Sequence, residues 1–250
     1  MKLEYFGVSD VGCVRDNNED GWLARNLTQD QWLLLVADGV GGRDAGEVAS
    51  ATVVEVFDQL AASGKLNAAS NAELAPALLS QAVQKAHVSV ARAAEAAAQK
   101  ASMSCTLSVA LVSGSRVNIV QVGDSRVYHW RDGELRQLTL DQTVAMQLLQ
   151  DGRITPEQVP GHPDRNTLFQ SIGLEASGSP LEPAHTECEL QAGDRLLLCS
   201  DGLTDMLNDA DISALLAQTE VVDDAAEALV QAALAAGGRD NVTVVVALAG

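Results

Sequence analysis

The chain has 250 residues, of which 47% are hydrophobic and 20% are charged. This composition is typical of a soluble globular protein and not of a disordered chain, and the length suffices for a substantial core. The formal net charge of −18 argues against a protein that binds nucleic acid or an anionic membrane surface.

No apolar run reaches the roughly 18 residues that a membrane-spanning helix needs. The first ten residues lack the basic and apolar regions of a secretory signal. The four cysteines are scattered and form no CxxC pair, which disfavours a zinc site or a disulfide framework. We therefore expect a cytoplasmic protein without a membrane span.

The first hundred residues carry strand signals followed by helix signals. Residues 2–10 have strand character, and the apolar run at 31–37 indicates a buried strand. Apolar residues recur at helical spacing through 45–62. Asn71 is the expected N-cap of a long alanine-rich helix that ends near Lys100.

The middle of the chain is rich in β signals. Four such runs lie between Cys105 and Thr139, separated by the turn signals SGSR, GDSR and RDGE, and they predict an antiparallel meander. Residues 141–175 are polar and contain three prolines, which indicates short helices in a flap-like excursion.

The last quarter alternates again between strand and helix signals. We expect strands at about 184–190 and 195–199, helices at about 210–217 and 222–236, and a final strand from 242 to 249. The chain contains no low-complexity linker and no repeat of fixed period. We therefore expect a single β-rich domain over residues 1–250, with long helices packed outside its sheets.

Aspartates recur where apolar strands begin or end. Asp38 follows LLLVA and Asp201 follows LLLCS, each with glycine next; Asp124 follows VNIVQVG, and Asp240 precedes NVTVVVA. A lone Asp-Gly pair is more often a turn than a ligand; a hairpin turn is the alternative for Asp124 with Ser125, and turn chemistry alone is the alternative for Asp240 with Asn241. A carboxylate held against the core nevertheless needs a compensating partner, because burying an unpaired charge costs several kcal/mol or more.

Cations of the protein itself do not supply that partner in an obvious way. The chain has only four lysines and none flanks these aspartates, while nearby arginines such as Arg126 and Arg239 can neutralise one carboxylate each. Mg²⁺ and Mn²⁺ prefer oxygen ligands. Provided that the strands converge, the pattern predicts an aspartate-rich site for two metal ions.

Six motifs carry a resemblance to a known family. They are RDNNED at 15–20, VADGVGG at 36–42, VGDSRVY at 122–128, LTLDQT at 138–143, LLLCSDGLTD at 196–205 and RDNVTVVV at 239–246. In this order they resemble the metal-dependent PPM/PP2C family of protein serine/threonine phosphatases, in its compact bacterial form. The resemblance covers nearly the whole chain and implies an α+β fold, a central antiparallel β-sandwich flanked by helices on both sides in four αββα layers.

The resemblance implies a core site for two ions, Mn²⁺ or Mg²⁺. In it Asp38 bridges the two ions, and the carbonyl of Gly39 contacts one of them. Asp201 and Asp240 hold the first ion.

Further residues are implied around that core. Glu19 corresponds to the acidic residue that orders waters on the second ion, and Asp20 supports it. Asp124 corresponds to a ligand of a third, weaker ion that it shares with Asp201, and Asn241 to a neighbour that supports the water shell.

Substrate contacts are implied as well. Arg15 corresponds to the arginine that grips the substrate phosphate, a task for which its planar fork of donors is suited. Some family members have histidine directly after the Asp-Gly pair as a proposed acid, whereas this chain has Val40. His162 and Arg165, in the flap-like excursion, are candidate substrate contacts, and a surface-loop role is the alternative for both.

The activity implied is hydrolysis of phosphoserine and phosphothreonine in proteins by a water that the two ions activate. The expected partners are phosphoprotein substrates, a serine/threonine kinase or its targets, and the expected state is a monomer. Two alternatives stay open: a phosphatase of other phosphoesters, and a catalytically silent binding module of the same fold. The presence of every expected carboxylate argues against the silent module.

Overall fold

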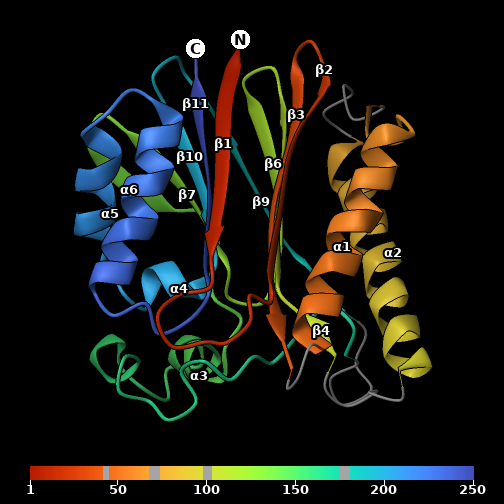
Figure 1. Cartoon of the computed structure of the whole chain (residues 1–250), viewed down its shortest axis with the longest axis vertical. Coiled ribbons are helices and arrows are strands. Elements are labelled where there is room, and N and C mark those ends of the chain that lie inside the picture. The colour runs from red at the N-terminus through yellow and green to blue at the C-terminus, as the bar shows by residue number, and fades with distance from the viewer. Residues whose placement is uncertain (42–44, 68–73, 98–102, 175–180) are drawn as a thin grey trace.

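Two antiparallel sheets lie face to face, and helices cover the outer face of each, in the computed structural model of the chain (Figure 1). The structure describes residues 1–41, 45–67, 74–97, 103–174 and 181–250. The α+β class and the central β-sandwich with helices on both sides are as the sequence predicts. Among the described residues, no helix has the length and apolar character needed to cross a membrane.

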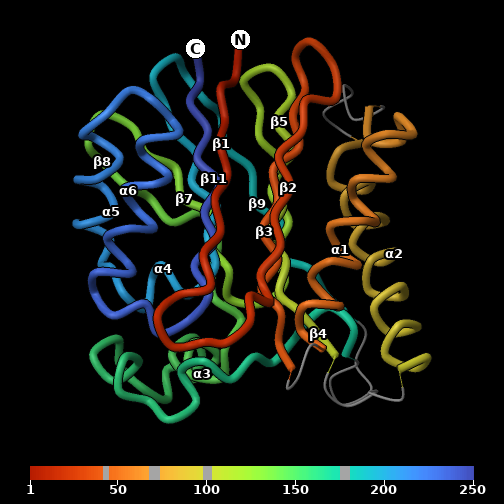
Figure 2. The backbone as a smooth tube through the Cα atoms, viewed as in Figure 1, coloured from red at the N-terminus to blue at the C-terminus, as the bar shows by residue number. Residues whose placement is uncertain are grey.

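One sheet joins the two ends of the chain. Its strands, in spatial order, are β1 (Leu3–Asp10), β11 (Val242–Ala249), β10 (Arg195–Cys199), β7 (Arg126–Arg131) and β8 (Glu134–Gln137). Because β1 pairs with β11 along its whole length, the termini lie side by side (Figure 2). Helices α5 (Asp209–Ala217) and α6 (Val222–Ala235) cover this sheet, and the short α4 (Asp201–Thr204) lies at its lower end in Figure 1.

The other sheet carries the first Asp-Gly strand. Its strands are, in spatial order, β2 (Asp20–Thr28), β3 (Gln31–Val40), β5 (Leu107–Ser113), β6 (Arg116–Val122) and β9 (Ala184–Glu189), with β4 (Ser104–Cys105) paired to the end of β3. Helix α1 (Ala45–Ala62) has the predicted bounds. Helix α2 (Ala75–Ala96) has Pro76 in its first turn, where proline costs no hydrogen bond. The predicted N-cap, Asn71, and the predicted end, Lys100, lie outside the described residues.

Apolar side chains fill three layers, one between the sheets and one beneath each pair of helices. Strand β10 shows how the leucine run serves two of them. Leu196 and Leu198 face the opposite sheet, whereas Leu197 and Cys199 face α5 and α6. A strand buried on both faces needs a continuous apolar sequence, which explains why LLLC has no polar alternation.

The predicted single meander between residues 105 and 139 is wrong in its middle. Strands β5 and β6 form one hairpin and β7 and β8 another, but the two hairpins belong to different sheets. The GDSR segment therefore crosses from one sheet to the other. Gly123 makes this crossing with φ of 97°, and an added Cβ there would lie 2.7 Å from the side chain of Thr106. Turn residues mark a hairpin and a crossover alike, so only sheet packing distinguishes them.

The described part of the excursion, residues 141–174, lies across the lower end of the sandwich in Figure 1. It contains α3 (Val144–Gln150) and one 3₁₀ turn (Pro156–Gln158), joined by turns. The side chain of Thr143 caps α3 by accepting a hydrogen bond from the Met146 N–H. The excursion thereby covers the end of the sheets at which the aspartates gather.

Candidate active site

A cavity of about 470 Å³ lies where three strands begin or end. Strand β3 ends at Asp38, β10 runs into α4 at Asp201, and β11 begins directly after Asp240. Asp124 comes to the same place through the crossing from β6 to β7. The site residues that line the cavity are Arg15, Glu19, Asp38, Gly39, Asp124, Asp201, Asp240 and Asn241.

The glycine after each aspartate is required by close packing. Gly39 and Gly202 are not among the residues with positive φ, so neither serves as a left-handed turn residue. A Cβ on Gly39 would lie 2.4 Å from the backbone of Gly46 in α1, and one on Gly202 would lie 1.9 Å from the backbone oxygen of Asn241. Each Asp-Gly pair thus lets another backbone segment approach the carboxylate directly.

The central carboxylates are buried close to one another. Burial, and then the charges of Asp20 and Asp201, raise the pKa of Asp38 well above its ordinary value. Burial followed by neighbouring acids likewise raises the pKa of Asp201 to about 7 and that of Asp124 well above its ordinary value. Such a cluster is stable only if protons or cations offset its charge.

These acids lie close enough for their charges to act on one another. Besides burial, the charges of Asp20, Asp201 and Asp124 all raise the pKa of Asp38. Among the described residues, no three acidic, histidine or cysteine side chains already surround one point as metal ligands. The carboxyl groups are thus near one another without a preformed cluster of three ligands.

Asp20 has a carboxylate oxygen without a hydrogen-bond partner. Its residue pairs with Asp38 across β2 and β3, and its Oδ2 accepts a hydrogen bond of 2.8 Å from Ser200. Its Oδ1 is buried without a hydrogen-bond partner. Burial is the main cause that raises its pKa to about 6. An orphaned carboxylate oxygen beside further carboxylates fits a divalent ion, whose charge and oxygen preference meet both needs.

Asn241 fastens the first motif to the site. Its Oδ1 accepts a hydrogen bond of 2.9 Å from the Glu19 N–H, and its Nδ2 donates to the carbonyls of Val11 and Asn17, each at 2.9 Å. Ser50 of α1 donates to the carbonyl of Glu19 at 2.6 Å. These bonds fix the backbone of Glu19 at the rim of the cavity.

Arg15 lies over the cavity and contacts one of the acids. Its guanidinium donates to Oδ2 of Asp240 at 2.6 Å, and 53% of the Arg15 side chain is exposed. The hydrogen bond to Asp240 is the main cause that raises the pKa of Arg15. The arginine is therefore charged, partly open to solvent and directed at the acids.

Two hydroxyl residues that sequence reasoning missed support Asp38. Oγ1 of Thr106 accepts from the Asp38 N–H at 2.9 Å and is hydrogen-bonded to Oγ of Ser125 at 2.6 Å. Both residues are buried. They tie the end of β3 to the crossing segment that carries Asp124. The signal available in the sequence was the polar pair within apolar strands, CTLS and GDSR.

The excursion contributes unevenly to the site. Asn166, Thr167 and Leu168 line the cavity. His162 lines neither this cavity nor the one beside it, and its Nδ1 accepts a hydrogen bond of 3.1 Å from the Asp164 N–H. The assignment of His162 to substrate binding therefore stays a prediction without support from its position.

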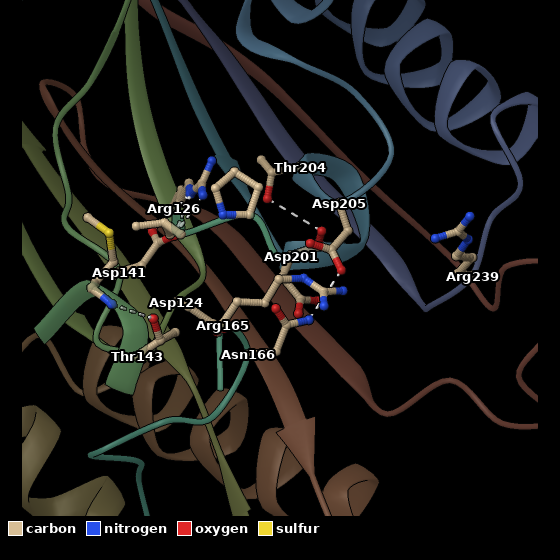
Figure 3. Close-up of a pocket in the computed structure, with 13 residues that line it drawn as sticks. Asp124, Arg126, Asp141, Thr143, Arg165, Asn166, Asp201, Thr204, Asp205 and Arg239 are labelled. Atoms are coloured by element: carbon tan, nitrogen blue, oxygen red, sulfur yellow. Dashed lines mark hydrogen bonds and ion pairs between the residues drawn. The ribbon is translucent and has the colours of Figure 1, made fainter. Parts of the chain in front are cut away.

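A second cavity of about 370 Å³ adjoins the first. The two share Asp124, Asn166 and Asp201 in their walls. Arg165 lines this side cavity, and Figure 3 shows its side chain reaching from the excursion toward Asp201 and Asp205. The predicted substrate contact Arg165 thus lies beside, and not within, the main cavity.

A family model described as protein phosphatase 2C matches residues 14–236. The chain belongs to the protein phosphatase 2C family. The match includes the first motif, both Asp-Gly strands and the excursion, so the expected family is confirmed.

Individual relatives agree with this membership. The serine/threonine protein phosphatase PstP of Mycobacterium tuberculosis is 42% identical over 250 residues, which cover 99% of this chain and 45% of the relative. The chain thus spans about half the length of the PstP sequences that it matches. The serine/threonine phosphatase Stp of Listeria monocytogenes is 34% identical over 236 residues, which cover 94% of this chain and 92% of the relative.

Solved structures of family members have the same fold. The catalytic domain of PstP in complex with two manganese ions is 39% identical and has a TM-score of 0.81, with 98% of this chain and 97% of that one covered. A serine/threonine phosphatase of S. agalactiae has a TM-score of 0.90 at 29% identity over the full length of both chains.

Proposed function

We propose that this member of the protein phosphatase 2C family is a metal-dependent phosphatase that hydrolyses phosphoserine and phosphothreonine in proteins. The observation that carries the proposal is the gathering of Asp38, Asp124, Asp201 and Asp240 in one cavity under Arg15. The PstP domain that binds two manganese ions supports it. Mn²⁺ or Mg²⁺ are the ions that this all-oxygen set suits.

The acidic residues divide into core ligands and supporting groups. Asp38, the carbonyl of Gly39, Asp201 and Asp240 would hold two ions, while Glu19 at the rim would order their waters. Bound there, two divalent ions supply positive charge and Lewis acidity for attack of water on a phosphate monoester.

Asp20 and Asp124 are the outer members of the set. Asp20, whose Oδ2 accepts a hydrogen bond from Ser200, would add negative charge beside Asp38, with which it is paired across β2 and β3. Asp124 would hold a third, weaker ion together with Asp201, since both also face the side cavity.

Arg15, at the mouth of the cavity, is the residue that would bind the substrate phosphate. A phosphoserine or phosphothreonine carries a charge of about −1.5 to −2 near neutral pH. Arg15 has the charge and the fork of donors to take two phosphate oxygens, and its exposure allows it to turn from Asp240 to the substrate. The residue after Asp38-Gly39 is Val40, which has no proton to give to the leaving group.

The setting of the activity is part of the proposal. All four cysteines, which the structure describes, are free thiols, and this supports a reducing compartment such as the cytoplasm. We infer that the protein acts there as a monomer on the targets of a serine/threonine kinase or on the kinase itself. The names of the PstP and Stp relatives support a phosphoprotein as substrate.

The test compares substrates and metals. A phosphothreonine peptide should be hydrolysed with Mn²⁺ or Mg²⁺ and not after chelation, and a phosphodiester should be hydrolysed far more slowly. A faster diester reaction would replace the proposal with the phosphoesterase alternative. If no phosphoester is hydrolysed at saturating metal, the phosphatase proposal fails and the catalytically silent binding module is the remaining alternative.

A further inference from the structure

The side cavity next to the active site has two arginines in its wall that have no use in the proposed chemistry. Arg165 comes from the excursion and Arg239 from the loop before β11. Both side chains are exposed, and neither forms an ion pair with a residue that the structure describes. Figure 3 shows Arg165 pointing toward Asp201 and Asp205, with Arg239 on the far side of Asp205 in this view.

Most of the other charged groups of this cavity have a partner. Arg126 donates to Asp141 at 2.6 Å. Asp124 and Asp201 line both cavities, and bound cations offset their charge in the proposed function. Asp205 accepts a hydrogen bond of 3.2 Å from Asn166, a neutral donor, and so keeps its charge. The charges left in the side cavity are therefore those of the two arginines and of Asp205, with the positive charge in excess.

We infer that the side cavity is a subsite for a second anionic group of the substrate, near the phosphorylated residue in the peptide, with Arg165 and Arg239 as its two cations. This inference rests on the proposed phosphatase function. Arginine suits the task because its planar donors match both a carboxylate and a phosphate. The anion is an acidic side chain or a second phosphorylated residue.

The shared wall sets how far the second anion lies from the first. Because the cavities adjoin at Asp124, Asn166 and Asp201, a peptide whose phosphate enters the main cavity passes the side cavity within a few residues. An extended chain advances about 3.3 Å per residue. The second anion therefore lies within about three residues of the phosphothreonine, a distance of roughly 10 Å.

The experiment measures kcat/KM on matched phosphothreonine peptides with Mg²⁺. One peptide has neutral flanks. A second set has a single glutamate at each position within about three residues on either side, and a third set has phosphothreonine in place of that glutamate. The protein should prefer the anionic peptides at one or two positions by roughly threefold to tenfold. A preference for the glutamate peptides would identify the second anion as a carboxylate. A preference confined to the doubly phosphorylated peptides would identify it as a phosphate.

Variants connect this preference to the two arginines. In Arg239→Gln and Arg165→Gln the ratio of anionic to neutral kcat/KM should fall, and in the double variant it should approach one. Arg92→Gln changes an exposed arginine on α2 that lines neither cavity; it makes the same charge change and should keep both ratio and activity. Thermal melts of all variants confirm folding.

Two results would overturn the subsite. One is equal kcat/KM for neutral and anionic peptides in the unaltered protein, and the other is a preference that survives in the double variant. Either result leaves hydrolysis of the neutral peptide intact, so the proposed function stands. Failure to hydrolyse any phosphopeptide would instead remove the proposed function and the subsite with it.

Discussion

Arg15 and Asp240 form an ion pair of 2.6 Å across the mouth of the cavity, although the proposed function assigns one to the substrate phosphate and the other to a metal ion. Each residue thus has an internal partner that its functional ligand must replace. In the proposed function, a cation on Asp240 would repel Arg15 and leave its guanidinium for a phosphate. Metal binding and substrate binding would then be coupled through this pair.

The first prediction concerns Arg15→Ala. KM for a phosphothreonine peptide should rise about tenfold or more, because the phosphate loses a bidentate charged partner. The affinity for Mn²⁺, measured by isothermal titration calorimetry without substrate, should stay equal or increase, because the ion no longer competes with the guanidinium for Asp240. Arg15→Lys keeps the charge, so its KM should lie between the values for Arg15→Ala and the unaltered protein. Weaker Mn²⁺ binding in Arg15→Ala would show that Arg15 helps to hold the metal and would refute the competition.

The second prediction concerns Asp38→Asn. Metal-dependent turnover should fall more than about a hundredfold, since even the loss of an outer partner of a metal ligand costs up to that factor. Folding should persist, because asparagine has the same shape and removes a buried charge from a crowded cluster. Circular dichroism and the thermal midpoint, measured for both proteins in the presence of a chelator, test whether folding persists. Full retained activity would defeat the assignment of the site.

The third prediction joins pH and metal removal. The folded pKa values of Asp20 and Asp201 are raised to about 6 and about 7, above an unfolded value of about 3.9. Stability from such groups is present below the unfolded pKa and is lost as the pH rises through the folded values. The metal-free protein should therefore melt at a lower temperature at pH 8 than at pH 5.

Added Mg²⁺ provides the control for that trend. An ion at a hundred times its dissociation constant stabilises the folded state by about 2.7 kcal/mol. At pH 8 the melting temperature should rise accordingly, and at pH 5, where protons compete for the carboxylates, it should rise less. A melting temperature that is independent of pH in the chelated protein would contradict the raised pKa values.

The fourth prediction concerns the second Asp-Gly pair. Gly202→Ala should reduce the free energy of unfolding by about 3 kcal/mol, because the new methyl group overlaps the backbone oxygen of Asn241. Turnover should fall with it, since Asp201 and the Asn241 contact to Glu19 both move. Gly161→Ala, which meets no atom within 4 Å, is the matched control and should be neutral. Urea unfolding measures both variants.

The fifth prediction tests a structural carboxylate away from the active site. Burial alone would raise the pKa of Asp194, but hydrogen bonds from Arg131, the Gln191 N–H and His129 outweigh burial and lower the pKa to about 2. A lowered folded pKa contributes stability above the unfolded value, near pH 4, that is lost as the pH falls toward 2.

Asp194→Asn should accordingly destabilise the protein by about 2 kcal/mol at pH 7, as measured by urea unfolding. Near pH 2 the difference from the unaltered protein should largely disappear. The exposed Glu227→Gln on α6 removes one negative charge without these contacts and should change little at either pH. An equal loss at both pH values would show that packing, and not charge, is responsible.

Much of the fold was accessible from local patterns. Helical spacing predicted α1 with its observed bounds. Apolar runs predicted β10 and β11 with their observed bounds and the start of β3, which continues three residues beyond the predicted end at residue 37. Local periodicity is sufficient here because each element buries one or two faces completely. The family resemblance added the roles of the site residues. Five of the acids, together with Arg15, Gly39 and Asn241, line one cavity.

What local patterns could not decide was which distant segments meet. By itself the sequence determined strands, helices and a set of acids that require cations, because these follow from periodicity and from the cost of burying charge. Only the tertiary structure decided that GDSR crosses between sheets, that Gly202 admits the backbone of Asn241, and that Arg15 pairs with Asp240. These contacts join residues far apart in the chain, and their energies depend on packing that no local pattern encodes.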